Sequence, residues 1–121
     1  METYTLPHYH SDDAEVENIL DEVQDVSHFA SIANVFKQLG DPTRVRIYWM
    51  LCHCEECVGN IAAAMDMTSP AVSHHLRLLC EAGLTEKRRD GKEVYYRACD
   101  TDECRLLHEM IEDVMEIRCP K

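Results

Sequence analysis

The stretch that decides the fold runs from Thr68 to Cys80 and reads Thr-Ser-Pro-Ala-Val-Ser-His-His-Leu-Arg-Leu-Leu-Cys. Ser69 can accept a hydrogen bond as a helix N-cap, and Pro70 has the fixed φ that suits the first helical position. Apolar residues then recur at helical spacing; they are Val72, Leu76 and Leu79. This pattern predicts a short amphipathic helix with one face in the protein core.

The other face of this helix carries polar side chains suited to nucleic acid. They are short or forked hydrogen-bonding groups, namely Ser69, Ser73, His74 and Arg77. Such groups can reach phosphates and base edges in a major groove. We therefore interpret the stretch as a DNA recognition helix.

The flanking segments supply the other parts of a winged helix-turn-helix. Upstream, residues 57–65 predict a second short helix, and Asp66-Met67-Thr68 makes the tight connection. Downstream, residues 84–89 and 93–98 predict two strands around an Asp-Gly pair, which is a strong hairpin signal. The hairpin is basic, and its residues expected to grip phosphates are Arg88, Arg89 and Lys92. The predicted fold class is mainly α with a small β-hairpin.

Four motifs in order carry a resemblance to a known family. They read LGDPTRVRI at 39–47, ECVGNI at 56–61, AVSHHL at 71–76 and GKEVYY at 91–96. With them the chain resembles the ArsR/SmtB family of bacterial metal-sensing transcriptional repressors, over about residues 36–119. The resemblance implies a homodimer that holds operator DNA until an effector metal binds.

Helical patterns also precede the recognition unit. Residues 14–39 carry an apolar pattern that suits one long helix or two shorter ones, and Gly40 ends it. Asp41 and Pro42 then begin a helix, as N-cap and first position, that continues to about Cys52.

The two ends of the chain have different expected roles. Residues 1–13 show no long periodicity, so we expect a flexible arm followed by one domain at 14–121. Residues 101–117 predict a last helix with a broad apolar stripe. We expect the same helix of a second copy to cover this stripe, giving a two-fold dimer for a pseudo-palindromic operator.

The net charge of −11 argues against a nucleic-acid partner until its distribution is considered. Residues 1–25 hold eight acidic residues and no Lys or Arg, and residues 100–116 hold seven acidic residues against Arg105 alone. Six of the twelve basic residues lie between His74 and Arg97. Positive charge is therefore local to the recognition helix and the hairpin, and we expect duplex DNA as partner.

Several classes of protein are disfavoured by the sequence. No apolar run is long enough to span a bilayer and the N-terminus has no export signal, so we expect a cytoplasmic protein without a membrane partner. A Gly-rich phosphate loop, a nucleophile elbow and a zinc-protease motif are all lacking, which argues against an enzyme.

One candidate metal site consists of carboxylates on the last helix. The resemblance places the paired ligands of zinc, cobalt and nickel sensors at Asp100, Asp102, Asp113 and Glu116. At about 1.5 Å per residue, Asp102 and Asp113 are roughly 16 Å apart along one helix, so only an antiparallel partner could complete this inter-subunit site. Asp102 and Asp113 replace histidines of the family pattern, and four carboxylates favour harder ions. The plain alternative is an acidic, solvated helix flank.

A second candidate site is built on thiolates. Residues 52–57 read Cys-His-Cys-Glu-Glu-Cys, and the alternative ligand set is Cys54, Cys57, His8 and His10, the histidines coming from the arm of a partner. Thiolates and imidazoles suit zinc, cadmium or lead. Gly59 stands where the Cys-Val-Cys motif of cadmium, lead and arsenic sensors has its second cysteine. The plain alternatives are buried cysteines and incidental arm histidines.

Two other functions remain open on the same fold. The seven cysteines suggest the hypothesis of a repressor that is switched by thiol oxidation or by sulfide, although acidic neighbours disfavour the thiolate form. The acidic net charge suggests the alternative hypothesis that the winged helix binds a protein instead of DNA. Of the three readings, the metal-responsive repressor uses most of the residues above.

Overall fold

The structure, a computed structural model, describes residues 6–8, 10 and 13–116. It is mainly helical with one small antiparallel sheet, and it divides into two compact units with the boundary between Asn34 and Val35. Of the expected arm at residues 1–13, only residues 6–8, 10 and 13 are described.

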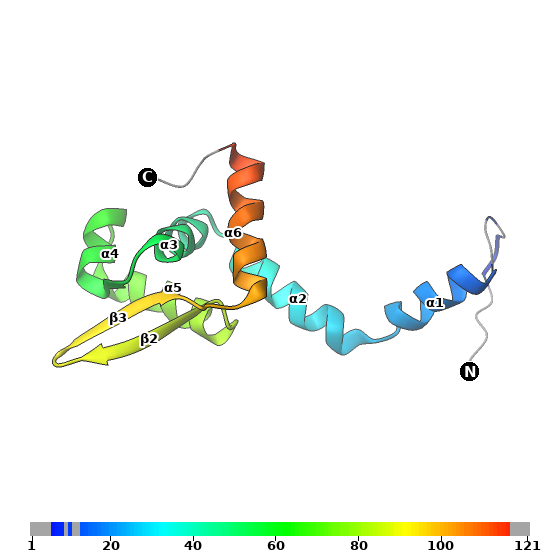
Figure 1. Cartoon of the computed structure of the whole chain (residues 1–121), viewed down its shortest axis with the longest axis horizontal. Helices are drawn as coiled ribbons and strands as arrows, with labels where there is room; N and C mark the ends of the chain where they lie inside the picture. The colour runs from blue at the N-terminus through cyan, green and yellow to red at the C-terminus, as the bar shows by residue number, and fades with distance from the viewer. Residues whose placement is uncertain (1–5, 9, 11–12, 117–121) are drawn as a thin grey trace. The chain divides into compact units, whose positions relative to one another are not determined.

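The first unit contains helix α1 (Asp13–Val23) and most of helix α2 (Val26–Gln38), shown in blue and cyan in Figure 1. Of the two sequence alternatives, two shorter helices are therefore confirmed. The break follows from a turn in which the Asp25 N–H donates to the Glu22 carbonyl at 3.0 Å. Several large apolar side chains of this unit are exposed, among them Ile19, Val26 and Phe29.

The second unit begins with the end of α2 and continues with helix α3 (Pro42–His53), whose start was predicted correctly. The Asp41 carboxylate accepts a hydrogen bond from the Arg44 backbone N–H at 3.0 Å, as an N-cap does. This hydrogen bond holds the pKa of Asp41 below its usual value. Helix α4 (Val58–Met65) and helix α5 (Ser69–Glu81) follow and form the helix-turn-helix.

The start of α5 differs by one residue from the prediction. The N-cap is Thr68 and not Ser69, because the Thr68 hydroxyl accepts from the Ala71 N–H at 3.3 Å. Ser69 is the first helical residue, and Pro70 still lies in the first turn, where its missing N–H costs nothing. Both residues suit a cap position by type, so the sequence alone does not separate them.

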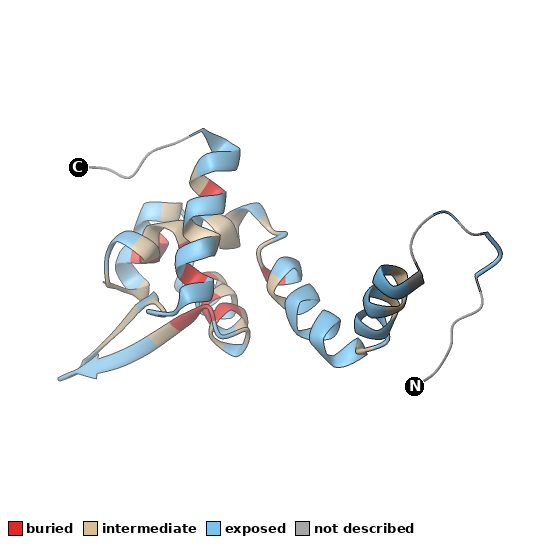
Figure 2. Ribbon diagram, turned by 45° about the vertical axis from the view of Figure 1, so that its right-hand side comes forward, coloured by how far each residue is buried: buried red, intermediate tan, exposed pale blue. Residues whose placement is uncertain are grey.

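The core of the second unit lies between α3, α4 and α5, where Figure 2 shows most of the buried residues. Its fully buried side chains are Ile47, Tyr48, Ile61, Val72, Leu76 and Leu79. Burying each large apolar side chain stabilises the fold by about 1.5–3 kcal/mol. The apolar face predicted for the recognition helix is therefore confirmed as part of this core.

The sheet has three strands in the order β1-β3-β2. Strands β2 (Thr85–Asp90) and β3 (Glu93–Ala98) form the predicted hairpin, one residue further along at the first strand, with Gly91 at φ 63° in the turn. Strand β1 (Glu56–Cys57) was not predicted; it pairs Cys57 with Tyr95 and joins the start of α4 to the hairpin.

The last helix, α6 (Asp102–Met115), packs against α3 and contributes Cys104 and Ile111 to the core. The Thr101 hydroxyl caps it by accepting from the Cys104 N–H at 3.2 Å, and Glu116 ends it in the left-handed region. Residue Ile117, the expected end of this helix, lies outside the described residues. The described helices include none long and apolar enough to cross a membrane.

Candidate nucleic-acid interface and metal ligands

The four residues of α5 that the sequence predicts to contact DNA lie on its exposed face. Ser69, Ser73, His74 and Arg77 are all exposed on α5, while Val72, Leu76 and Leu79 face inward. An Arg77 Nη2 atom lies 3.1 Å from Nδ1 of His74, which is one turn away on the same helix. The helix thus presents a continuous polar row with its hydrogen-bonding groups directed outward.

A contact that sequence analysis missed fixes this helix to α3. The Arg44 guanidinium donates to the Gln38 carbonyl at 2.7 Å and lies 3.1 Å from Nδ1 of His75. Because a guanidinium only donates, His75 must accept at Nδ1 and be neutral. Burial lowers the pKa of His75, which agrees with that state. His75 therefore holds α5 in place, and its neighbour His74 faces solvent.

The wing is the β2–β3 hairpin, and its cations lie on both faces. Cross-strand partners share a face, and Lys87 and Arg89 stand opposite Tyr96 and Val94. Arg88 alternates to the other face, where its guanidinium lies 5.0 Å from the Tyr95 ring centroid. All three cations and Lys92 in the turn are exposed.

Arg88 differs from the other wing cations because it already has an anionic partner. Its Nε and Nη2 atoms each donate to the Glu55 carboxylate at 2.8 Å. This pairing lowers the pKa of Glu55 and raises the pKa of Arg88. Arg88 can grip a phosphate only by leaving Glu55, whereas Arg89 and Lys92 have no such competitor among the ion pairs of the described residues.

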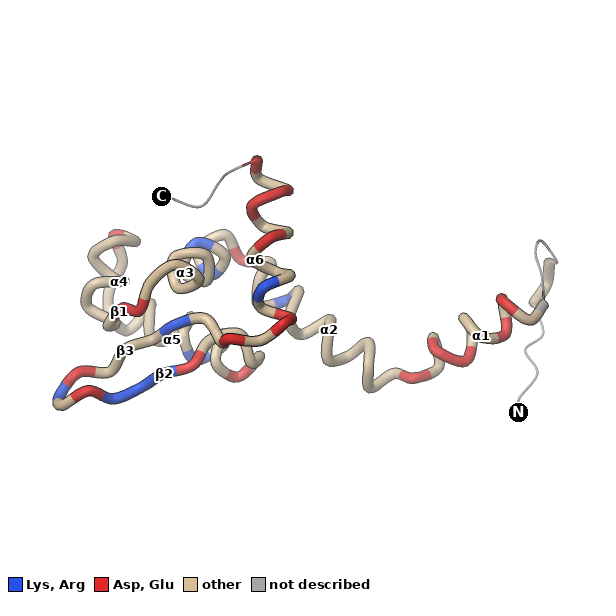
Figure 3. Tube along the Cα trace, in the orientation of Figure 1, with Lys and Arg blue, Asp and Glu red and all other residues tan. Residues whose placement is uncertain are grey.

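Charge is segregated along the chain. In Figure 3 the acidic residues colour α1 and α6, and the basic residues form the longest blue stretch in β2. The acidic elements leave the exposed surface of α5 and the wing as the place where a polyanion can bind. The net charge of −11 therefore does not exclude DNA as a partner.

Asp100 and Asp102, the first half of the carboxylate site, are paired with a cation from their own chain. The Arg105 guanidinium donates to Asp100 at 2.6 Å and also to Asp102. A metal at these carboxylates must displace it. Asp113 and Glu116 are exposed at the other end of α6. A single chain therefore does not bring the four carboxylates together, in agreement with the helical rise.

The thiols of the second candidate site lie in different surroundings. Cys54 is exposed and its Sγ donates to the Met50 carbonyl at 3.4 Å, and Cys57 is half-buried in β1. His8 and His10 stack on each other with their ring centroids 5.8 Å apart, within the other unit. Desolvation is the largest cause raising the pKa of the Cys54 thiol, and burial raises the pKa of Cys99 to about 11. Both shifts favour the protonated thiol, which makes Cys54 and Cys99 poor candidates for a thiol switch.

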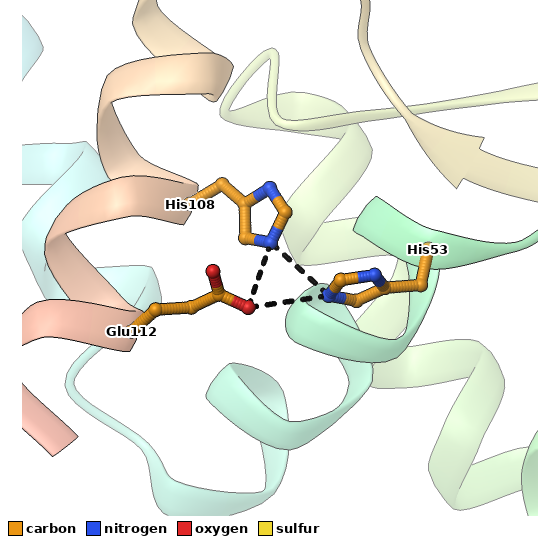
Figure 4. Close-up of side chains that lie close together, drawn as sticks. All are labelled: His53, His108 and Glu112. Carbon is orange, nitrogen blue, oxygen red and sulfur yellow. Dashed lines mark hydrogen bonds and ion pairs between the residues drawn. The ribbon is translucent and has the colours of Figure 1, made fainter. Parts of the chain in front are cut away.

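A different group of ligand-type side chains does converge, at the joint between α3 and α6. His53 from the end of α3 meets His108 and Glu112 from α6, as Figure 4 shows. Within the described ranges it is the one cluster of three or more such residues whose ligand atoms all lie within 4.8 Å of one another. Cys104, one turn before His108 on α6, does not join the group, because it is buried and its thiol donates to the Leu84 carbonyl.

A helix-turn-helix with an exposed polar recognition helix and a basic wing defines a DNA-binding protein of the transcription-regulator class. Comparison with known proteins makes the assignment narrower. Residues 41–87 match the family model described as "Bacterial regulatory protein, arsR family". The chain is 35% identical over 102 residues to the transcriptional repressor SmtB homolog of Synechocystis sp., covering 84% of this chain and 77% of that protein. It therefore belongs to the ArsR/SmtB family of transcriptional repressors.

Two further relatives agree with this assignment. A cadmium resistance transcriptional regulatory protein, the CadC homolog of Staphylococcus aureus, is 43% identical over 70 residues, which are 57% of this chain and 58% of that protein. The solution structure of a homodimeric winged helix-turn-helix DNA-binding domain from Mycobacterium bovis superposes with a TM-score of 0.69 at 30% identity, covering 75% of this chain and 83% of that one. The predicted fold and family are thus confirmed.

Proposed function

We propose that the protein is a homodimeric repressor that binds operator DNA through α5 and the wing and leaves it when a metal ion binds. The observation that carries the proposal is the exposed polar row on α5 beside a cationic hairpin, in a molecule that is otherwise strongly acidic. The SmtB and CadC homologs add weight, because one is named as a repressor and the other for cadmium resistance.

The dimer is supported by the apolar surface of α6. Four large side chains are exposed on this one helix: Leu106, Met110, Val114 and Met115, with Val114 at 76%. A contiguous apolar face of this kind is costly in water and marks an interface. A second copy is the proposed occupant, as in the homodimeric relative from Mycobacterium bovis.

The proposed contacts divide into specific and general ones. Ser73, His74 and Arg77 read base edges from α5, with Ser69 on the backbone at its N-terminus. Arg89 and Lys92 bind phosphates from the wing, and Arg88 joins them when DNA competes with Glu55. A two-fold dimer would present its two recognition helices to half-sites about 34 Å apart, one turn of duplex.

The effector must favour the form that binds DNA poorly, since a ligand shifts an equilibrium only through its differential affinity. The candidate ligands from the sequence remain proposals: the set Asp100, Asp102, Asp113 and Glu116 across the dimer, and the set Cys54, Cys57, His8 and His10. Zinc can bind to either ligand set, with less selectivity at the four carboxylates, and cadmium or lead suits the thiolates.

The test uses the full chain and a duplex selected from a random library by the metal-free protein. Operator affinity is measured by fluorescence anisotropy while Zn²⁺, Cd²⁺, Pb²⁺ or Mn²⁺ is added, with ultraviolet absorption recorded in parallel. A loss of affinity with at least one ion supports the proposal, and thiolate bands then indicate the cysteine set. Unchanged affinity with all four ions removes metal as the effector and leaves the DNA-binding assignment in place.

A further inference from the structure

We infer that His53, His108 and Glu112 form a divalent metal site inside a single subunit, of the zinc class, separate from both ligand sets above. The geometry of the three side chains supports metal binding. That this site acts as the effector site rests, in addition, on the proposed function.

The spacing of the three ligand atoms matches one face of a tetrahedron. Nε2 of His53 and Nε2 of His108 are 3.1 Å apart, and the Glu112 carboxylate oxygen lies 3.5 Å and 3.2 Å from them. Metal–ligand bonds of about 2.0–2.1 Å in a tetrahedron place neighbouring ligands about 3.3 Å apart. A zinc ion can therefore touch all three atoms without a movement of the backbone.

Without a cation, the same arrangement crowds the protons of the two imidazoles. Each imidazole Nε2 is either a donor or an acceptor, and the carboxylate oxygen only accepts. All three atoms point at one another (Figure 4), and both imidazoles can donate from Nε2 to the Glu112 oxygen only if their two N–H groups lie side by side, with the nitrogens 3.1 Å apart. A metal ion satisfies all three at once.

Neighbouring groups hold the ligands in this geometry. The Trp49 indole N–H donates to the same Glu112 oxygen at 3.1 Å, which orients the carboxylate as outer-shell donors do. The His53 ring packs on Trp49 with centroids 4.5 Å apart and meets His108 edge-on at 4.7 Å. The side chains are only 22% exposed for each histidine and 13% for Glu112. Counted as whole residues, His108 and Glu112 are half-buried and His53 is exposed, so the group lies at the surface with its side chains partly shielded from water.

Access and coordination number indicate the class of ion. A cavity of about 330 Å³ opens beside both histidines, also lined by Cys52 and Asp100, and leaves room for water as a fourth ligand. Two imidazoles and one carboxylate suit Zn²⁺, Co²⁺ or Ni²⁺ better than Mg²⁺ or Ca²⁺, which prefer oxygen alone. An ion here would tie α3, which leads into the helix-turn-helix, to α6.

The test is a Co²⁺ and Zn²⁺ titration of the metal-free full chain without DNA. Trp49 is the only tryptophan of the chain, so its fluorescence reports directly on this site. We expect tight binding of one ion per subunit with visible cobalt bands of a tetrahedral site, lacking thiolate charge transfer. The variants H53Q and H108Q should lose this binding, and W49F should weaken it by about 10-fold. The matched controls D113N/E116Q and C54S/C57S should bind as the wild type does.

Nitrogen-15 spectra of the histidine rings in the wild-type protein guard against a variant that misfolds. Zinc should shift Nε2 of two of the seven histidines. Wild-type binding by H108Q, loss of binding in either control, or no histidine shift would overturn the inference. Adding operator DNA afterwards separates the two claims: metal bound at His108 with unchanged DNA affinity contradicts its effector role but not the site.

Discussion

Neighbouring arginines of the wing should differ in how much they contribute to the electrostatic part of DNA binding. Arg88 and Arg89 are adjacent in β2, equally charged and both exposed, yet they occupy opposite faces of the hairpin. Arg88 is held by hydrogen bonds from its Nε and Nη2 atoms to Glu55, and Arg89 is not. The perturbation is the pair of single variants R88Q and R89Q, which remove the same charge one residue apart.

The magnitude follows from counterion release. Each phosphate contact contributes about 0.9 to the slope of log affinity against log salt concentration. R89Q removes one contact from each wing, so the slope of the proposed dimer should fall by about 1.8. R88Q should reduce the slope by less than half as much, because Glu55 already compensates its charge. In the E55Q background, R88Q should reduce the slope by as much as R89Q does.

The assay is fluorescence anisotropy with one selected duplex over a series of potassium chloride concentrations. E86Q is the matched control for E55Q, since Glu86 pairs with Arg97 on the same hairpin. It removes an equal negative charge and leaves Arg88 paired. Equal slope changes for R88Q and R89Q, or an E86Q background that acts as E55Q does, would refute the reasoning.

Three further predictions concern stability. Burial holds the folded pKa of His75 below its usual 6.5, so the unfolded chain takes up the proton first as the pH falls. The free energy of unfolding should therefore be constant with respect to this group above pH 6.5 and should decrease below it. Urea titrations of H75Q should show less of this decrease. T68A should lower the free energy of unfolding by about 1 kcal/mol and T68S by less, because Thr68 and not Ser69 caps α5. A larger loss of stability in S69A than in T68A would contradict this cap. Y48F should cost about 1 kcal/mol, because the buried Tyr48 hydroxyl donates to the Cys104 carbonyl and links α3 to α6; thermal melts showing no loss would contradict the link.

The fold followed from local signals wherever those signals were strong. Asp41-Pro42 and the Asp-Gly pair of the hairpin act within a few residues, so their elements were predicted to within one or two positions. Strand β1 has two residues and no periodicity, and it exists only because β3 offers it an edge. Pairing of this kind depends on tertiary placement, which no local pattern encodes.

The candidate sites divide in the same way. The exposed face of α5 was predictable because its polar and apolar residues alternate with the helical period. The group of His53, His108 and Glu112 was not, because 55 residues separate its two histidines in the chain. One signal was present: His108 and Glu112 are four residues apart on α6. Choosing His53 and not Cys104 as their companion requires the packing of α3 on α6.

Hydrogen exchange of the full chain, with and without a selected operator duplex, tests the central claim most directly. The account predicts that DNA slows exchange in α5 and the β2–β3 hairpin, and leaves α1 and the acidic outer face of α6 unchanged. Slowed exchange confined to α1 or α6, or no change at a DNA concentration that saturates anisotropy, would contradict the view that an acidic protein binds duplex DNA through this one basic and polar surface.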